Sequence, residues 1–222
     1  MKTYIVSGHY GSGKTEVSLN LCLYLKKSNK NVTIADLDVI NPYFRSRQKI
    51  KQLNDSGINV IAGSLNSNTG QDIPAVSYAF ISNINKGENV VLDLGGGLQG
   101  TKILAPCYDA IKNNDYEFLC VLNAFRSETD TAEKMINFIN QINLASPIKI
   151  SGLVNNGHML SYTQNEHILH SQKEILKISK MLNLPISFTL LQNNIYEDIK
   201  NEIISNEVII FHEPQIRENW QN

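Results

Sequence analysis

Residues 5–19, IVSGHYGSGKTEVSL, contain a glycine-rich segment with the pattern G-x-x-x-x-G-K-T. Glycines in such a loop let backbone amide groups point inward around phosphate oxygens, and the helix that follows adds its positive end. A lysine and a threonine at the end of the pattern suit the β- and γ-phosphates and Mg²⁺, respectively. The sequence therefore predicts a nucleotide site made of Gly8, Gly11, Ser12, Gly13, Lys14, Thr15 and Glu16.

Carboxylates that such a loop requires follow two other apolar runs. In NVVLDLGGG, Asp93 is placed to hold Mg²⁺, and the glycines at 95–97 leave room for a γ-phosphate. In TIADLDVINPYFR, Asp36 and Asp38 point the same way if the segment is extended, so both can face the metal and an attacking water. Each pattern also fits an ordinary turn or helix cap.

The elements that must position these residues alternate along the chain. Apolar runs predict strands, and stretches with helical spacing predict helices between them. This alternation predicts an α/β fold, a mostly parallel sheet of about seven strands with helices on both faces. We expect strands at 3–7, 31–36, 59–63, 89–95, 116–123, 148–156 and 186–191, helices at 14–28, 127–145 and 165–183, one domain over 1–210, and a tail over 211–222.

Composition narrows the functional classes. The 222 residues are 42% hydrophobic and 18% charged with a net charge of −1, which argues against nucleic acid as a primary ligand. The three cysteines, Cys22, Cys107 and Cys120, are far apart, which disfavours a zinc site, an iron–sulfur site or a disulfide framework. No apolar run approaches the ~20 residues of a membrane span, and the N-terminus reads as a strand, so we expect a cytoplasmic location.

The order of these motifs resembles one branch of phosphate-loop proteins. That branch holds partition and Min-type ATPases, the nitrogenase iron protein and nickel-insertion ATPases. DLDVINPYFRSR with DLGGG resembles more closely a little-characterised group of bacterial and archaeal ATP-binding proteins. The resemblance implies a phosphate-loop NTPase fold and ATP with Mg²⁺ as ligands. The chain contains no N-K-x-D motif for guanine, which also favours ATP over GTP.

The resemblance also implies residue roles. Lys14 and Thr15 would bind phosphate and Mg²⁺, Asp36 would hold magnesium through water, and Asp38 would orient the hydrolytic water. Asp93 would contact the water ligands of magnesium, Gly96 would sense the γ-phosphate, and Asn155 would read the adenine edge. Asn155 also fits a polar strand end.

One position departs from the family pattern. Partition-type members carry a second lysine directly after the first loop glycine, and that lysine reaches the nucleotide of a partner subunit. His9 stands at that position here, and histidine is charged only part of the time near neutral pH. A nucleotide-dependent homodimer with a cation acting across it is therefore in doubt.

Two further segments could contact a substrate or partner. Tyr43 and Arg45, in the stretch 41–47 after the acidic pair, fit a nucleotide-dependent switch or an ordinary helix start. Arg126 follows a strand at the edge where open α/β sheets bind ligands, and fits a second anion site or a partner site.

Three functions remain open at this stage. The first is a slowly hydrolysing Mg-ATPase that switches its affinity for a protein or metalloenzyme target. The second is an ATP-dependent kinase or ligase that acts on a small molecule, of the dethiobiotin-synthase type. The third is a nucleotide-binding regulator without significant turnover.

Overall fold

A single sheet of eight parallel strands organises the protein. The computed structural model describes residues 1–28, 31–38, 47–62 and 78–211. The strands follow the order β3-β2-β4-β1-β5-β6-β7-β8 across the sheet. Their bounds are β1 Thr3–Gly8, β2 Val32–Leu37, β3 Ile58–Ala62, β4 Asn89–Leu94, β5 Tyr116–Leu122, β6 Gly152–Asn155, β7 Ile186–Gln192 and β8 Glu207–Phe211. The predicted α/β class is confirmed, and the sheet holds one strand more than the seven expected.

Helices cover both faces of this sheet. They are α1 Lys14–Lys26, α2 Arg47–Asp55, α3 Phe80–Asn85, α4 Gly97–Thr101, α5 Tyr108–Lys112, α6 Ala132–Ala145, α7 Asn165–Leu182 and α8 Asn193–Ile199, with short 3-10 turns η2 Lys102–Cys107 and η3 Leu160–Tyr162. No helix among the described residues is both long and apolar enough to cross a membrane.

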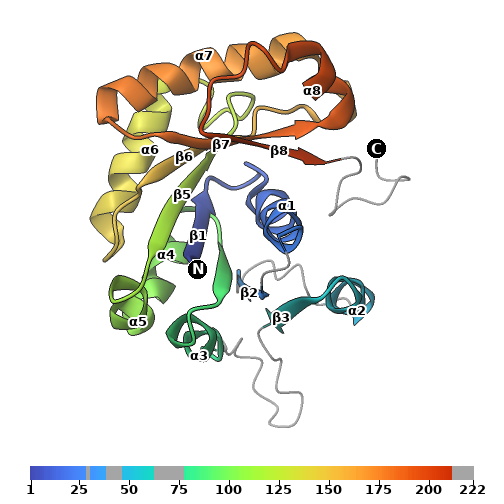
Figure 1. Cartoon of the computed structure of the whole chain (residues 1–222). Helices are drawn as coiled ribbons and strands as arrows, with labels where there is room; N and C mark the ends of the chain where they lie inside the picture. The colour runs from blue at the N-terminus through green and yellow to red at the C-terminus, as the bar shows by residue number, and fades with distance from the viewer. Residues whose placement is uncertain (29–30, 39–46, 63–77, 212–222) are drawn as a thin grey trace.

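Alternation along the strands divides the apolar core into two layers. Ile5 in β1 packs with the buried residues of α3, α5, α6 and α7. Its neighbour Val6 packs on the opposite face with α1 and α2. Figure 1 shows α1 on one side of β1, with α5 and α6 on the other. Both faces are buried, which explains why the strands read as continuous apolar runs.

The three cysteines lie inside these layers. Cys22, Cys107 and Cys120 are all buried and free. Burial raises the pKa of the Cys107 thiol to about 11 and that of Cys120 to about 12. All three are protonated packing residues at neutral pH, because burial in apolar surroundings disfavours the thiolate.

The helix expected over residues 127–145 begins five residues later than its sequence pattern indicates. The hydroxyl of Thr131 accepts a hydrogen bond from the backbone N–H of Lys134 at 3.3 Å, and α6 starts at Ala132. Residues 127–130 form turns before it. The sequence of residues 127–130, SETD, has the Ser-x-x-Asp pattern of a capped helix start and suggested the earlier beginning. That start was wrong, because the later Thr131 caps the helix. The helix expected over 165–183 matches α7 closely.

Parallel pairing brings the carboxyl ends of five strands to one edge of the sheet. Asp36 in β2 pairs in register with Asp93 in β4, and Gly8 in β1 pairs with Val121 in β5. Asn155 ends β6, beside β5. In open parallel sheets this edge is where ligands bind. The fold therefore gathers most of the sequence-predicted site residues in one place.

Candidate nucleotide and metal site

The phosphate loop is a tight turn between β1 and α1. Ser12 donates its backbone N–H to the carbonyl of His9 at 3.1 Å, which closes the turn. Gly13 precedes α1 with φ of 87°, a left-handed conformation that favours glycine. A Cβ at Gly8 would lie 2.7 Å from the backbone carbonyl oxygen of Val121, so this position also requires glycine. The backbone of the loop is thus shaped to wrap around a small anion.

Lys14 lies at the centre of the site and is almost fully buried. Its side chain is 8% exposed, and Nζ donates to the carbonyl of His9 at 3.2 Å. A Cβ at Gly96 would lie 3.4 Å from Nζ, so the loop after β4 passes directly over the ammonium group. Burial lowers the pKa of Lys14, and the carboxylates of Asp93 and Asp38 act in the opposite sense. An anionic ligand here would compensate the buried charge.

Asp93 is buried beneath the start of α1. Its Oδ1 accepts a hydrogen bond from the Ser18 hydroxyl at 3.0 Å, and the Thr15 hydroxyl is a second donor. Burial and the nearby Asp36 carboxylate raise the pKa of Asp93 to about 7, although these donors and Lys14 act in the opposite sense. Ser18 was not predicted from the sequence. It lies one helical turn after Thr15, so both hydroxyls share the helix face toward Asp93.

Asp36 and Asp38 occupy the end of β2, beside Asp93. Asp36 is 6% exposed, and its Oδ1 accepts the backbone N–H of Asp38 at 3.1 Å. Oδ1 of Asp38 would lie 3.3 Å from a Cβ at Gly95, so Asp38 faces the loop after β4. Asp36 acts on the pKa of Asp93, and Asp38 acts on that of Lys14. The structure thus places Asp36 beside Asp93, and Asp93 and Asp38 near the lysine.

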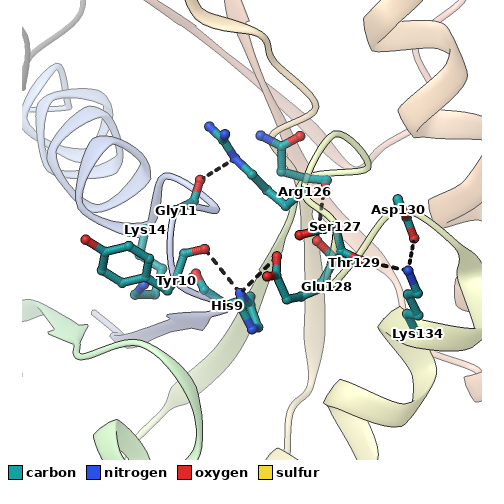
Figure 2. Close-up of polar contacts among 11 residues, drawn as sticks. His9, Tyr10, Gly11, Lys14, Arg126, Ser127, Glu128, Thr129, Asp130 and Lys134 are labelled. Carbon is teal, nitrogen blue, oxygen red and sulfur yellow. Dashed lines mark hydrogen bonds and ion pairs between the residues drawn. The ribbon is translucent and has the colours of Figure 1, made fainter.

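The loop between β5 and α6 holds the outer side of the phosphate loop. Arg126 donates Nε to the carbonyl of Gly11 at 2.9 Å, and Glu128 Oε2 lies 4.0 Å from His9 Nδ1 (Figure 2). Asn123 shapes this loop: its Oδ1 accepts the backbone N–H of Phe125 at 3.0 Å. Arg126, predicted at the rim, therefore contacts the phosphate loop itself. Glu128 was not singled out from the sequence, because an exposed acidic residue in a polar loop carries no signal.

Two adjacent asparagines, at the end of β6 and directly after it, differ in their surroundings. Asn155 is fully buried, and its Oδ1 accepts hydrogen bonds from the Ser171 hydroxyl and the backbone N–H of Gly157 at 2.8 and 3.1 Å. Asn156 donates Nδ2 to the carbonyl of Ser12 at 2.7 Å and so supports the phosphate loop directly. The family resemblance indicated only Asn155, and no pattern in the sequence predicted the contact of Asn156 with the phosphate loop.

The remaining predicted residues are placed as follows. Glu16, in the first turn of α1, accepts a hydrogen bond from Asn20 Nδ2 at 2.7 Å. Tyr43 and Arg45 lie outside the residues that the structure describes.

The residues of the site fit a nucleotide with a divalent cation. The Ser12 hydroxyl is buried in the loop and finds no hydrogen-bond partner among the described residues, as expected where a phosphate oxygen would accept from it. Asp36 and Asp93 are both buried and in register, and two adjacent carboxylates ionise together more readily beside a cation. No group of three or more His, Cys, Asp or Glu that could hold a metal ion by themselves occurs in the described part of the chain. Mg²⁺ beside a nucleotide needs only one or two carboxylates, with phosphates and waters as its other ligands.

Comparison with known proteins gives a family and a fold. The model of the CobQ/CobB/MinD/ParA nucleotide binding domain matches residues 3–202. Among solved structures, FtsY from Thermotoga maritima is 21% identical with a TM-score of 0.55, over 86% of this chain and 61% of that chain. Chloroplast FtsY from Physcomitrella patens is 18% identical with a TM-score of 0.55, over 85% and 57%.

The signal recognition particle 54 kDa protein from Aeropyrum pernix K1, in complex with GDP, is 16% identical with a TM-score of 0.56, over 85% of this chain and 40% of that chain. At these identities the likeness concerns the fold alone. The chain spans less than two thirds of the length of each of these three proteins. No curated protein matches the sequence.

Proposed function

Since this chain belongs to the CobQ/CobB/MinD/ParA nucleotide-binding domain family, we propose that it binds Mg-ATP, hydrolyses it slowly and thereby switches its affinity for a protein or metalloenzyme target. The observation that carries this proposal is the convergence of Lys14, Asp93 and Gly96 at the phosphate loop. The loop over the lysine would contact a γ-phosphate and change position once that phosphate leaves. Binding and hydrolysis would thus be coupled through this one loop.

Each polar group of the site receives a role in this proposal. Lys14, Ser12 and the loop amides bind phosphates. Thr15, Asp36 and Asp93 hold Mg²⁺, which when bound neutralises charge that develops on the phosphates. Asp38 orients the attacking water, since its carboxylate faces Gly95 on the loop that covers Lys14. Gly96 would sense the γ-phosphate, because it lies directly over the lysine.

Asp38→Asn is the variant that tests hydrolysis. It keeps the size of the side chain but removes the charge that orients water, so we expect the ATPase rate to fall by at least about 100-fold with ATP affinity nearly unchanged. Phosphate release and ATP binding are measured on the same preparation. Asp109→Asn, on the exposed side of α5, is the matched control and should behave as the wild type. An unchanged rate in Asp38→Asn would favour a regulator without turnover.

The proposal that the protein prefers ATP to GTP rests on residues at the end of β6 and directly after it. Guanine presents two adjacent donors that a carboxylate accepts, whereas adenine presents a donor and an acceptor that suit an amide. The segment from Asn155 to Leu160, NNGHML, contains amides but no carboxylate. Asn155 would read adenine through Nδ2, which is buried and lacks a partner among the described residues. GDP is bound in the structure of the Aeropyrum protein, but that protein resembles this chain in fold alone. Its ligand therefore does not decide between ATP and GTP here.

Three finer assignments belong to the same proposal. The chain would be a member of the group that carries the NPYFR segment, with Tyr43 and Arg45 in contact with the target. Residues 1–210 would form the nucleotide-binding domain, with 211–222 as a tail. A homodimer that forms only with ATP remains in doubt because His9 replaces the lysine of partition-type proteins. Mass measurements with ADP and with a non-hydrolysable ATP analogue test the dimer directly.

A further inference from the structure

An open pocket of about 340 Å³ lies beside the phosphate loop, outside the predicted phosphate and metal positions. Its walls come from the phosphate loop, the start of α4 and one face of α6. Pockets of this volume hold small ligands rather than macromolecules. The side chains that matter for its chemistry are His9, Leu98, Glu128, Asn137, Phe138 and Gln141.

The charges around the pocket leave one carboxylate available. Lys134 also lines the pocket, but its Nζ donates to Asp130 Oδ1 at 2.8 Å and to the carbonyl of Ser127 at 2.7 Å (Figure 2). The carboxylate of Glu128 lies 4.0 Å from the His9 ring, and the charges of His9 and Lys134 act on it less strongly than the Ser127 side chain does. Hydrogen bonding by the Ser127 side chain lowers the pKa of Glu128, so this carboxylate is ionised at neutral pH. The pocket therefore presents a negative charge.

Apolar surface lies next to this charge. Phe138, on α6, is 6% exposed and packs against the His9 ring with centroids 5.6 Å apart. Leu98, on α4, is 37% exposed and faces the same pocket. The amide side chains of Asn137 and Gln141 add polar groups along α6. A short apolar chain with a positively charged end matches this arrangement.

Two walls of the pocket belong to segments that would contact a nucleotide in the proposed function. His9 is the second residue of the phosphate loop, and its carbonyl accepts a hydrogen bond from Lys14 Nζ. Gly97, at the start of α4, directly follows Gly96, the residue that covers Lys14. A change in these segments would alter the pocket, so a ligand there and the nucleotide would influence each other's affinity.

We propose that this pocket binds a small molecule with a protonated amine on a short apolar chain, and that its affinity depends on the bound nucleotide. The amine pairs with Glu128, and the chain lies on Phe138 and Leu98. The amine site follows from the pocket and does not require the proposed function. The dependence of its affinity on nucleotide rests on the proposed function.

Calorimetric titration of 1,5-diaminopentane tests the amine site. We expect binding to the wild type and at least about 10-fold weaker binding to Glu128→Gln, which keeps the shape but removes the charge. Glu133→Gln, also near the start of α6 but outside the pocket, is the matched control and should bind as the wild type. Melting temperatures of both variants verify that they are folded. Equal affinity of the two variants, or no binding to the wild type, would overturn the amine site.

Glutarate, a dicarboxylate of similar length, is the second probe. We expect no binding, because Lys134 is already paired and Glu128 repels anions. Tighter binding of glutarate than of the diamine would assign the pocket to an acidic ligand and refute the proposal.

The third measurement repeats the diamine titration with ADP and with a non-hydrolysable ATP analogue. We expect the two affinities to differ by at least about 5-fold. Equal affinities with both nucleotides bound would overturn the coupling and leave the proposed function intact. If neither nucleotide binds the wild type, the proposed function fails, whereas diamine binding by the nucleotide-free protein still decides the amine site.

Discussion

Replacement of Lys14 by alanine is expected to lower nucleotide affinity by at least about 100-fold, because a buried ammonium forms charge-assisted hydrogen bonds with phosphates. The side chain is 8% exposed and is covered by Gly96. Among the described residues, Arg126 does not replace this charge, since it contacts the outer side of the loop at Gly11. Fluorescent-nucleotide titration measures the loss.

The same variant should keep its fold. Burial lowers the pKa of Lys14, which means that the charge is costly to hold in the nucleotide-free protein. Its removal should therefore leave the melting temperature of that form unchanged or raised. Lys51→Ala, on the exposed side of α2, serves as the control and should bind nucleotide as the wild type does. Wild-type affinity in Lys14→Ala would contradict the placement of phosphates at this loop.

Asp93→Asn should change how stability depends on pH in the protein without metal and nucleotide. The pKa of Asp93 is raised from 3.8 to about 7, so the folded protein holds a proton that the unfolded chain releases. This contribution to stability is complete below about pH 4 and is lost as pH rises through about 7. Asparagine stays neutral at every pH. We therefore expect that the free energy of unfolding of the variant, measured with urea, does not decline in this way as pH rises. At pH 8 the variant should be more stable than the wild type.

The same substitution should weaken the effect of magnesium on nucleotide binding. Mg²⁺ must compete with the proton on Asp93, so in the wild type the gain from added Mg²⁺ should increase as pH rises through about 7. In Asp93→Asn that gain should fall by at least about 10-fold, since residues that hold the ligands of a metal typically contribute this much. Asp55→Asn, at the exposed end of α2, is the control. A wild-type magnesium effect in Asp93→Asn would remove this carboxylate from the metal site.

The sequence was sufficient to predict the sheet and the central residues of the site, because both depend on local patterns. Gly8 to Thr15, with an apolar strand before and a helix after, can form little else than a phosphate loop. Asp36 and Asp93 each follow a buried strand, and parallel pairing brings such strand ends together. β8 was missed because its five residues, EVIIF, are short and only partly buried at the sheet edge.

Contacts between distant segments could not be predicted. Arg126 and Glu128 reach the phosphate loop only because β5 lies beside β1, and no periodic pattern records the direction of either side chain. Asn156 supports Ser12 across 144 positions of sequence. The start of α6 depended on competition between two capping residues, which propensity alone does not resolve.

The most direct test of the proposed function is a calorimetric titration of ATP and GTP into the wild-type protein, with and without Mg²⁺. We expect that ATP binds, that Mg²⁺ strengthens its binding, and that GTP binds at least about 10-fold more weakly, which is the cost of leaving base-edge groups unpaired. Equal or tighter binding of GTP would contradict the assignment of ATP. An ATP affinity that is the same with and without Mg²⁺ would contradict the roles given to Asp36 and Asp93.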